Sequence, residues 1–466
     1  MLFHTLEFAA LFLLVLPFGL WAENRTRRVA LLVASYAFYA WFSVALCSLM
    51  AFSTFLDFSV GRGLHRSQDP RRRRQLLAIS LVGNLGLLFA FKYTNWFLGS
   101  INSLSMLFTG DAPFALYDII LPLGISFYTF QTLSYTIDIY RREMNPTNSL
   151  LTFALYVAFF PQLVAGPIVR AANLVPQLDR GPAFAPGQVR WGMGVFVFGL
   201  VKKVVLADNL AQIANTVFAD PGSFPGWGVL LGTYAFAFQI YCDFSGYTDM
   251  ARGIAAILGY DIGTNFNFPY FAVGVRDFWR RWHISLSTWL RDYLYIPMGG
   301  GRCSPARRRM NIMNTMLLGG LWHGANWTFV VWGGIHGAWI SLEHALDRIG
   351  WRIGSETMSI PVRVLGTLVT FHLVCVTWIF FRAESFGDAV GILFGLLRRG
   401  PSPPLDLAML GFVPLLLLVD LLMWKTNLTA WILRRRFAFW LAMWVGIVVT
   451  LVFGDFRGND FVYFQF

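Results

Sequence analysis

The chain has 466 residues, of which 56% are hydrophobic, 17% are aromatic and only 13% are charged. This composition excludes an ordinary soluble protein, and the long uncharged runs favour membrane helices over the alternating strands of a membrane barrel. The net charge of +12 (37 basic minus 25 acidic residues) comes from arginine clusters between apolar runs, which is typical of cytoplasmic loops. We therefore predict an all-α, polytopic integral membrane protein that contacts lipids and binds no nucleic acid.

Apolar runs long enough to enter a membrane recur along the whole chain. We predict about ten to twelve membrane-embedded segments in one membrane domain, with a polar connection at 102–113. The apolar runs lie at 8–22, 29–60 (two short spans or a hairpin), 76–91, 119–137, 150–169, 191–206, 227–242, 364–381, 407–419 and 437–453.

Charged and helix-breaking residues in or near these runs predict further features of three of them. The first run has no basic residue before it and an arginine cluster at 25–28 after it. We therefore expect an uncleaved span whose N-terminus lies outside the cytoplasm. Pro161 and Gly166 predict a break in the fifth run, as in a re-entrant segment. Lys202 and Lys203 are expected to extend their amines to the membrane surface.

Two carboxylates, Asp243 and Asp249, follow the run at 227–242. They could form an acid–base pair, but six residues at about 100° each place them on different faces of a helix. We expect instead a polar loop at the end of a span.

The stretch 277–324 contrasts most strongly with the apolar chain around it, because it opens with charged residues around a histidine. On one helix, His283, Ser287 and Arg291 recur every four residues and share a face, so the pattern predicts a helix that lines a polar cavity. An amphipathic helix at the membrane surface, with its arginines on the headgroups, is the alternative, and composition alone favours it slightly. Ionisable groups are costly at membrane depth, and this stretch is therefore the main candidate for a functional site.

Two histidines, His323 and His336, lie in the otherwise uncharged run at 312–342. An imidazole there can be a general base, a metal ligand or a hydrogen-bonded core residue. On one continuous helix they would lie about 220° apart around the axis and about 20 Å apart along it, so a shared metal requires that glycines break the run. The four cysteines show no metal-ligand spacing, and we expect no metal site.

Seven short motifs occur in the chain, and their order and spacing are informative. They are Leu121-Pro-Leu-Gly-Ile-Ser-Phe-Tyr-Thr-Phe-Gln131, Phe160-Pro-Gln-Leu-Val-Ala-Gly-Pro167, Tyr241-Cys-Asp-Phe-Ser-Gly-Tyr-Thr-Asp249, Asn265-Phe-Asn-Phe-Pro269, Asp277-Phe-Trp-Arg-Arg-Trp-His283, Arg291-Asp-Tyr-Leu-Tyr-Ile-Pro297 and Gly320-Leu-Trp-His-Gly324. With these motifs the chain resembles the membrane-bound O-acyltransferase (MBOAT) family, most of all its bacterial AlgI-like branch of alginate and exopolysaccharide O-acetyltransferases. The resemblance implies a single membrane domain over 1–466, with a motif core at about 119–381 and C-terminal spans within 407–453.

The resemblance also implies a helical fold around a central tunnel. By match of motif, His323 of Trp-His-Gly would lie at its narrow centre, and His283 of Arg-Trp-His would be the second site histidine. We expect His323 to act as a general base or as a transient acyl acceptor. His283 would orient the substrate or His323, or stabilise charge, and His336 is given no catalytic role.

A basic segment between the two histidine motifs comprises Arg302, Arg307, Arg308 and Arg309. We expect it to attract an anionic acyl thioester, such as acetyl-CoA, to the cytoplasmic mouth of the tunnel. No bound cofactor is expected apart from this donor substrate. The resemblance further implies a bacterial inner-membrane location and periplasmic partners that modify a polysaccharide.

Three other functions stay open at this stage. They are D-alanyl or other acyl transfer from a carrier protein, proton-coupled transport in which the histidines relay protons, and a scaffold for a polysaccharide synthase. The pairing of His283 and His323 with a basic segment favours the acyltransferase, because a thioester donor needs that segment and a solute carrier does not. The acceptor is open among alginate, cellulose, peptidoglycan and other glycans.

Overall fold

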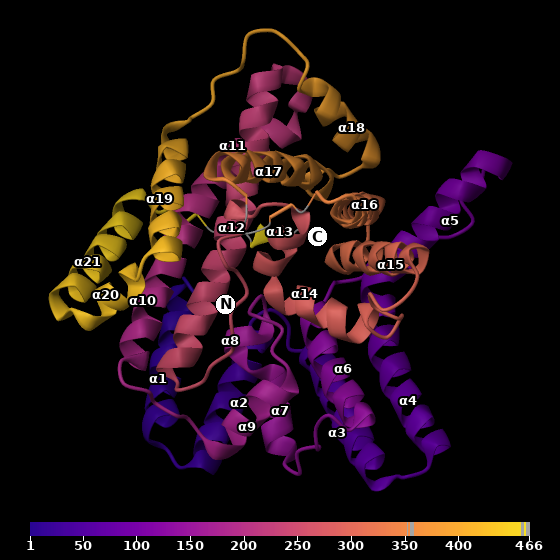
Figure 1. Ribbon diagram of the computed structural model, residues 1–466. Helices are drawn as coiled ribbons and strands as arrows, with labels where there is room; N and C mark the ends of the chain where they lie inside the picture. Colours follow the sequence, from indigo (N-terminus) through magenta and orange to yellow (C-terminus); the bar gives the residue numbers. More distant parts are fainter. Residues whose placement is uncertain (352, 355–357, 458–460, 463–466) are drawn as a thin grey trace. The chain divides into compact units, whose positions relative to one another are not determined.

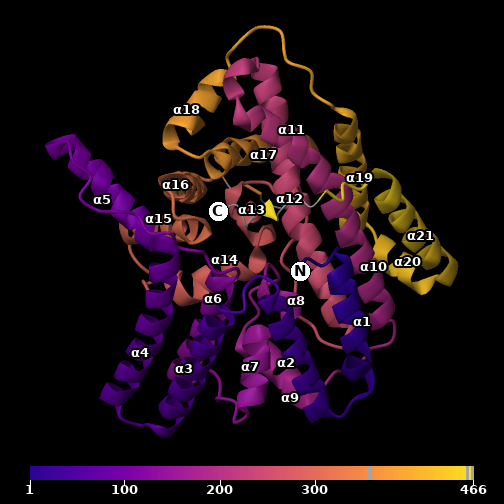
Figure 2. The ribbon, with the colours of Figure 1, turned by 180° about the vertical axis from the view of Figure 1, so that it is seen from behind.

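The computed structural model describes residues 1–351, 353–354, 358–457 and 461–462, and every regular element in them is helical (Figures 1 and 2). This confirms the all-α prediction. The chain divides into two compact units, which are described separately. The first unit comprises residues 1–189 and 254–263, and the second comprises residues 190–253 and 264–466.

The first unit is built from the N-terminal helices. In it α3 packs against α4 and α6, while α2 packs against α1 and α7. The elements are α1 (Leu6–Trp21), α2 (Asn24–Ala40), α3 (Cys47–Arg66), α4 (Pro70–Leu88), the π-helix η1 (Phe89–Tyr93), α5 (Thr94–Thr109), α6 (Ile125–Arg141), α7 (Leu150–Ala158), α8 (Phe160–Leu163) and α9 (Ala171–Arg180).

Two predictions for the first unit have different outcomes. The break in the fifth run is confirmed, because α7 ends at Ala158 and a short helix follows. The polar connection at 102–113 is wrong, because α5 continues to Thr109. Hydroxyl groups in this helix bond back to the preceding turn, for example Thr109 Oγ1 to the Ser105 carbonyl at 3.0 Å, so its polar residues do not end it.

The second unit contains the longest helix and the stretch that carries the two histidine motifs. Its elements are α10 (Gln188–Leu200), the π-helix η2 (Val201–Ala207), α11 (Asp208–Ala219), η3 (Pro221–Ser223), α12 (Gly226–Ile257), η4 (Pro269–Phe271), α13 (Val275–Arg281), α14 (Ile284–Leu290), the π-helix η5 (Arg291–Tyr295), α15 (Pro305–His323), α16 (Trp327–Arg348), α17 (Ile360–Arg382), α18 (Phe386–Gly395), η6 (Ala408–Gly411), α19 (Phe412–Lys425), α20 (Leu428–Arg434) and α21 (Arg436–Phe453).

Four helical segments are long and apolar enough to cross a membrane, among the residues that the structure describes. They lie at Pro70–Thr109, Ile360–Arg382, Ala408–Lys425 and Arg436–Phe453. Their apolar side chains are largely exposed, as in α21, where Phe437 is 82% exposed. Large exposed apolar surfaces of this kind require an apolar environment, which a bilayer provides.

A buried ionic cluster corrects two predictions for the second unit. Lys202 and Lys203 do not extend to a surface, because their side chains are only 4% and 1% exposed. Lys202 Nζ lies 2.5 Å from Asp249, and Lys203 Nζ lies 2.8 Å from Asp208 and 2.9 Å from Asp243. The two predicted loop carboxylates are inside α12, and they face different lysines because they lie on different helix faces. Buried charges of opposite sign partly offset each other's desolvation, so these residues can lie in the interior of the unit.

Candidate active site

The predicted helix through His283 is interrupted at that residue. Helix α13 ends at Arg281, α14 begins at Ile284, and His283 has the left-handed backbone angles φ 42° and ψ 54°. His283 is therefore the N-cap of the helix that carries Ser287 and reaches Arg291, and not a residue inside a continuous helix. A left-handed conformation is uncommon for a residue with a side chain, and it persists only where surrounding contacts hold it.

Asn265, in the loop after α12, supplies those contacts. Its carbonyl accepts a hydrogen bond from the Ile284 backbone at 2.9 Å. Its side-chain Oδ1 accepts from the Ser285 backbone at 3.1 Å and from Ser285 Oγ at 2.8 Å. Asn265 thus binds the first turn of α14 through its main chain and its side chain. These hydrogen bonds hold the chain at His283 in the left-handed conformation, so α13 does not continue into α14.

The same asparagine fixes the proton on His283. A backbone N–H can only donate, so the bond from Ser285 identifies the Asn265 atom as the amide oxygen. This oxygen also lies 3.1 Å from His283 Nδ1, which must therefore carry the hydrogen. His283 is fully buried, and its Nε2 holds the lone pair that can accept a proton or a hydrogen bond.

His323 is the last residue of α15 and is 4% exposed. The chain turns there through Gly324 into α16, whose first turn is capped by Asn326 Oδ1. A Cβ atom on Gly324 would overlap the ring of Phe329. The glycine of the Trp-His-Gly motif is therefore required for space, because the turn packs directly on this ring.

The two motif histidines lie together in the second unit. Their ring centroids are 6.2 Å apart, and the ring of Trp322 lies 5.9 Å from His283 and 5.1 Å from His323. Trp332 and Phe381 pack on His323 at 5.2 and 5.4 Å. Aromatic walls of this kind exclude water and strengthen electrostatic interactions at the imidazoles.

His336 has a different environment, although it is also fully buried. Trp279 Nε1 donates to its Nδ1 at 3.3 Å, so the ring hydrogen is on Nε2, which lies 3.1 Å from Thr377 Oγ1. Thr377 in turn donates to the Val374 carbonyl at 2.7 Å. Both nitrogens of His336 are thus used within the protein, as expected for a hydrogen-bonded core residue.

The predicted donor-side arginines lie at the opposite end of α15 from His323. Along the helix axis, Arg308 and His323 are about 22 Å apart at 1.5 Å per residue. The structure therefore brings the two histidines together and leaves the basic segment remote from them. Arg302, Arg307 and Arg309 are exposed, and Arg308 is half-buried.

Arg308 contacts His344 near the end of α16. Its Nη2 lies 3.0 Å from His344 Nε2. Burial, followed by the positive charges of Arg308 and Arg276, lowers the pKa of His344 to about 4. This histidine is therefore neutral at physiological pH and adds no charge to the basic segment.

Three charged residues at the start of this region, Arg276, Asp277 and Arg281, hold α13 in place. Arg281 pairs with Asp277 at 3.0 Å within α13. The preceding Arg276 pairs with Glu343 at 2.9 Å and with Asp347 at 2.5 Å, and it thereby attaches α13 to α16. These ion pairs therefore position α13, the helix that leads into His283.

Sequence reasoning gave no role to Asn265, which appeared only in a motif of the resemblance. Asn265 is eighteen positions before His283 in the chain. Because both residues lie outside regular helices, the periodicity of a helix or strand could not predict that they meet. A polar residue in the segment Asn265-Phe-Asn-Phe-Pro269 was the only available signal.

Comparisons with known proteins agree on one family. A model of the membrane-bound O-acyltransferase family matches residues 32–382. The chain is 43% identical to "Probable alginate O-acetylase AlgI" of Azotobacter vinelandii over 84% of this chain and 76% of that protein. It is 36% identical to the peptidoglycan O-acetyltransferase of Helicobacter pylori, over 79% of this chain and 73% of that protein. Identity to the teichoic acid D-alanyltransferase of Bacillus subtilis is 28%, over 57% of this chain and 69% of that protein.

Proposed function

Because this chain belongs to the membrane-bound O-acyltransferase family and is an O-acyltransferase, we propose that it acetylates an extracytoplasmic polysaccharide. The acetyl group would come from a cytoplasmic thioester, acetyl-CoA, and would cross the membrane through this protein. Greater identity to the two O-acetylating relatives than to the D-alanyltransferase supports acetyl as the group transferred.

The observation that carries the proposal is the adjacent pair of buried histidines, one of which has a fixed tautomer. Acyl transfer to a hydroxyl requires a base, and an imidazole suits this task near neutral pH. We assign the base to His323. The Nε2 lone pair of His283 accepts a hydrogen bond from the substrate hydroxyl or from His323 and so orients them.

The proposed reaction couples transfer of the acetyl group to transfer of the hydroxyl proton. His323 takes the hydroxyl proton as the sugar oxygen bonds to the thioester carbonyl carbon. The C–S bond breaks, and the imidazolium returns the proton to the leaving thiolate. Ring N–H and indole N–H groups near the histidines are candidate donors to the developing oxyanion.

Helix α15 supports the proposed path of the donor. It carries Arg307 to Arg309 in its first turn, just after Arg302, and His323 at its end, about 22 Å from Arg308 along the axis. An anionic donor held by Arg302 and the arginines at 307–309 could therefore present its acyl end toward the histidines. We place this basic end at the cytoplasmic face of a bacterial inner membrane.

The acceptor is proposed to be an alginate-like or peptidoglycan-like glycan, by analogy with the relatives named above. Periplasmic partner proteins would select the acceptor hydroxyl.

The test measures O-acetyl groups on extracellular and cell-wall glycans from a deletion strain that carries wild-type, His323→Ala or His283→Ala protein. In parallel, membranes receive labelled acetyl-CoA, and label release from the donor is followed. Loss of a positioned base should lower the rate by about 10² to 10⁴-fold at normal protein abundance. His65→Ala, an exposed position at the end of α3, is the matched control.

Unchanged acetylation in the deletion strain and in both site variants would overturn the acetyl assignment. Label transfer from a D-alanyl carrier protein instead of acetyl-CoA would replace the donor. Normal activity in His323→Ala alone would move the role of base to His283.

A further inference from the structure

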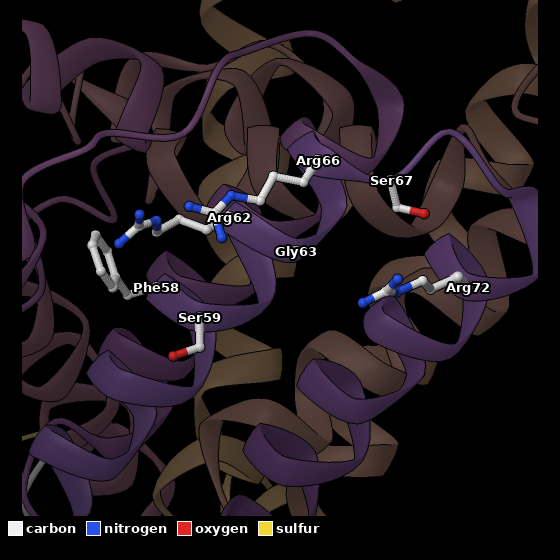
Figure 3. A pocket seen from close by; sticks show the side chains of 7 residues that line it. All are labelled: Phe58, Ser59, Arg62, Gly63, Arg66, Ser67 and Arg72. Carbon is white, nitrogen blue, oxygen red and sulfur yellow. The ribbon is translucent and has the colours of Figure 1, made fainter.

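A basic hollow lies in the first unit, where α3 ends and α4 begins. It has a volume of about 380 Å³ and no acidic lining residue among those that the structure describes. Arg62 and Arg66 come from α3, and Arg72 extends from α4 (Figure 3). The lining residues are Phe58, Ser59, Arg62, Gly63, Arg66, Ser67 and Arg72.

The three arginines of this hollow have no acidic partner. Within the described part of the chain, none of their guanidinium groups forms an ion pair with a carboxylate. Arg62 lies over the ring of Phe58 at 5.5 Å, a cation–π contact that leaves its N–H groups available in the guanidinium plane. Three positive charges around one hollow therefore favour an anion, and several N–H donors match a phosphate.

Arg73, a fourth arginine in the same turn, has a structural role. Arg73 is only 7% exposed, and its guanidinium donates hydrogen bonds to backbone carbonyls. It donates to Leu64, to Ser67 at 3.3 Å, to Ile139 at 3.2 Å and to Tyr140 at 2.7 Å. Arg73 thus caps the end of α3 and fixes the turn beside the hollow.

An apolar hollow lies on the same face of α3, closer to the middle of the helix. It has a volume of about 390 Å³ and is lined by residues of α2, α3 and α7: Leu32, Tyr36, Ala51, Thr54, Phe55, Leu150, Leu151 and Ala154. Its α3 residues Ala51 and Phe55 share a helix face with Phe58, Arg62 and Arg66 of the basic hollow, within about 80° at 3.6 residues per turn. One helix face therefore leads from an apolar hollow to a basic one.

The surroundings of both hollows suit a bilayer. Helix α4 begins the candidate span Pro70–Thr109, and the apolar side chains of Phe52, Phe55 and Val82 are 50%, 59% and 73% exposed. The basic hollow lies at the charged end of this apolar helix pair, where lipid headgroups would be. Basic pockets between helices at this level recognise anionic headgroups.

We propose that this face of α3 binds one anionic phospholipid, independently of the acyltransferase reaction. Arg62, Arg66 and Arg72 hold its phosphate, and an acyl chain lies in the apolar hollow beside Ala51 and Phe55. A free phosphate or a nucleotide would use the arginines but not the apolar hollow.

The test is lipid binding to the purified full-length protein in detergent, measured by native mass spectrometry with phosphatidylglycerol and phosphatidylcholine. We expect wild-type protein to prefer phosphatidylglycerol, and Arg66→Gln/Arg72→Gln to weaken that binding about thirtyfold. The matched control is Arg71→Gln/Arg74→Gln, which removes the same charge from the same turn at exposed positions outside the hollow. Ala51→Phe, which fills the apolar hollow, should also weaken lipid binding.

Equal loss in the two arginine pairs would overturn the site in favour of general surface charge. Displacement of phosphatidylglycerol by millimolar inorganic phosphate or acetyl-CoA, with Ala51→Phe unaffected, would replace the lipid with a soluble anion. No preference for phosphatidylglycerol over phosphatidylcholine would overturn the proposal outright.

Discussion

Two histidine environments in the second unit have the same burial and similar aromatic walls, yet their chemistry differs. His336 uses both ring nitrogens on Trp279 and Thr377. His283 is held at Nδ1 by Asn265, and its ring lies 6.2 Å from that of His323. Burial therefore does not distinguish a core histidine from a candidate catalytic one, whereas the hydrogen-bond inventory of each nitrogen does.

The comparison also shows how each environment is built. His336 lies in the middle of a regular helix, α16, where its partners come from packed neighbours. His283 and His323 lie at helix ends, one in a left-handed junction and one before a glycine turn. Helix ends present side chains at interruptions of regular packing, and strained backbone gathers at functional sites.

The largest effect that separates these environments should come from Asn265→Leu. The change removes the acceptor that holds the Nδ1 hydrogen of His283, so the ring can take the other tautomer or rotate. We expect the acetyl-transfer rate to fall about a hundredfold, with kcat affected more than KM. Asn265→Asp keeps an acceptor oxygen and should restore much of the rate.

Asn267→Leu is the matched control for this change, because Asn267 is exposed and lies two positions along the same loop. If Asn265→Leu and Asn267→Leu lowered kcat equally, the tautomer argument would fail and the loop as a whole would be implicated.

The opposite behaviour is expected of Thr377→Val beside His336. Valine has a similar shape but cannot accept a hydrogen bond, so the buried Nε2–H loses its partner at a cost of about 1–3 kcal/mol in unfolding free energy. Activity per folded molecule should stay close to wild type. Thermal unfolding in detergent and specific activity measure the two quantities, and a hundredfold loss of activity in a normally folded variant would make His336 part of the reaction.

Composition predicted the membrane-protein class and the helical fold, because it carries that information locally. The motif resemblance selected His283 and His323, whose rings the structure places 6.2 Å apart. The sequence did not predict the junction at His283. The hydrogen bonds that interrupt the helix there come from Asn265, a distant residue in another loop. The prediction that Lys202 and Lys203 extend to the membrane surface failed for a related reason. Their partners Asp208, Asp243 and Asp249 are recognisable only once η2 packs against α12 and neutralises each charge in the interior.

A smaller effect should come from the C-terminal segment, through Phe461. Its fully buried ring packs on Phe244 at 6.0 Å, and Phe244 packs on His283 at 4.7 Å. Phe461→Leu should loosen this support and lower kcat a few-fold while KM stays unchanged. Phe456→Leu changes an exposed ring in the same segment and should have no effect; equal kinetics for the two variants would remove Phe461 from the support of the site.

The smallest effect concerns His344, near the end of α16 and outside the four candidate spans. Burial and the charges of Arg308 and Arg276 lower its folded pKa from 6.5 to about 4, against a smaller opposing effect of Asp347. Between these values an unfolded His344 binds more protons than a folded one, so its contribution to stability falls as the pH drops from 6.5 toward 4 and is constant above 6.5. His344→Gln should flatten this part of the curve of unfolding temperature against pH. Because His336→Gln removes a histidine that is hydrogen-bonded through both nitrogens, it should instead lower stability at every pH. Parallel curves for wild type and His344→Gln would show that folding does not lower the pKa of this imidazole.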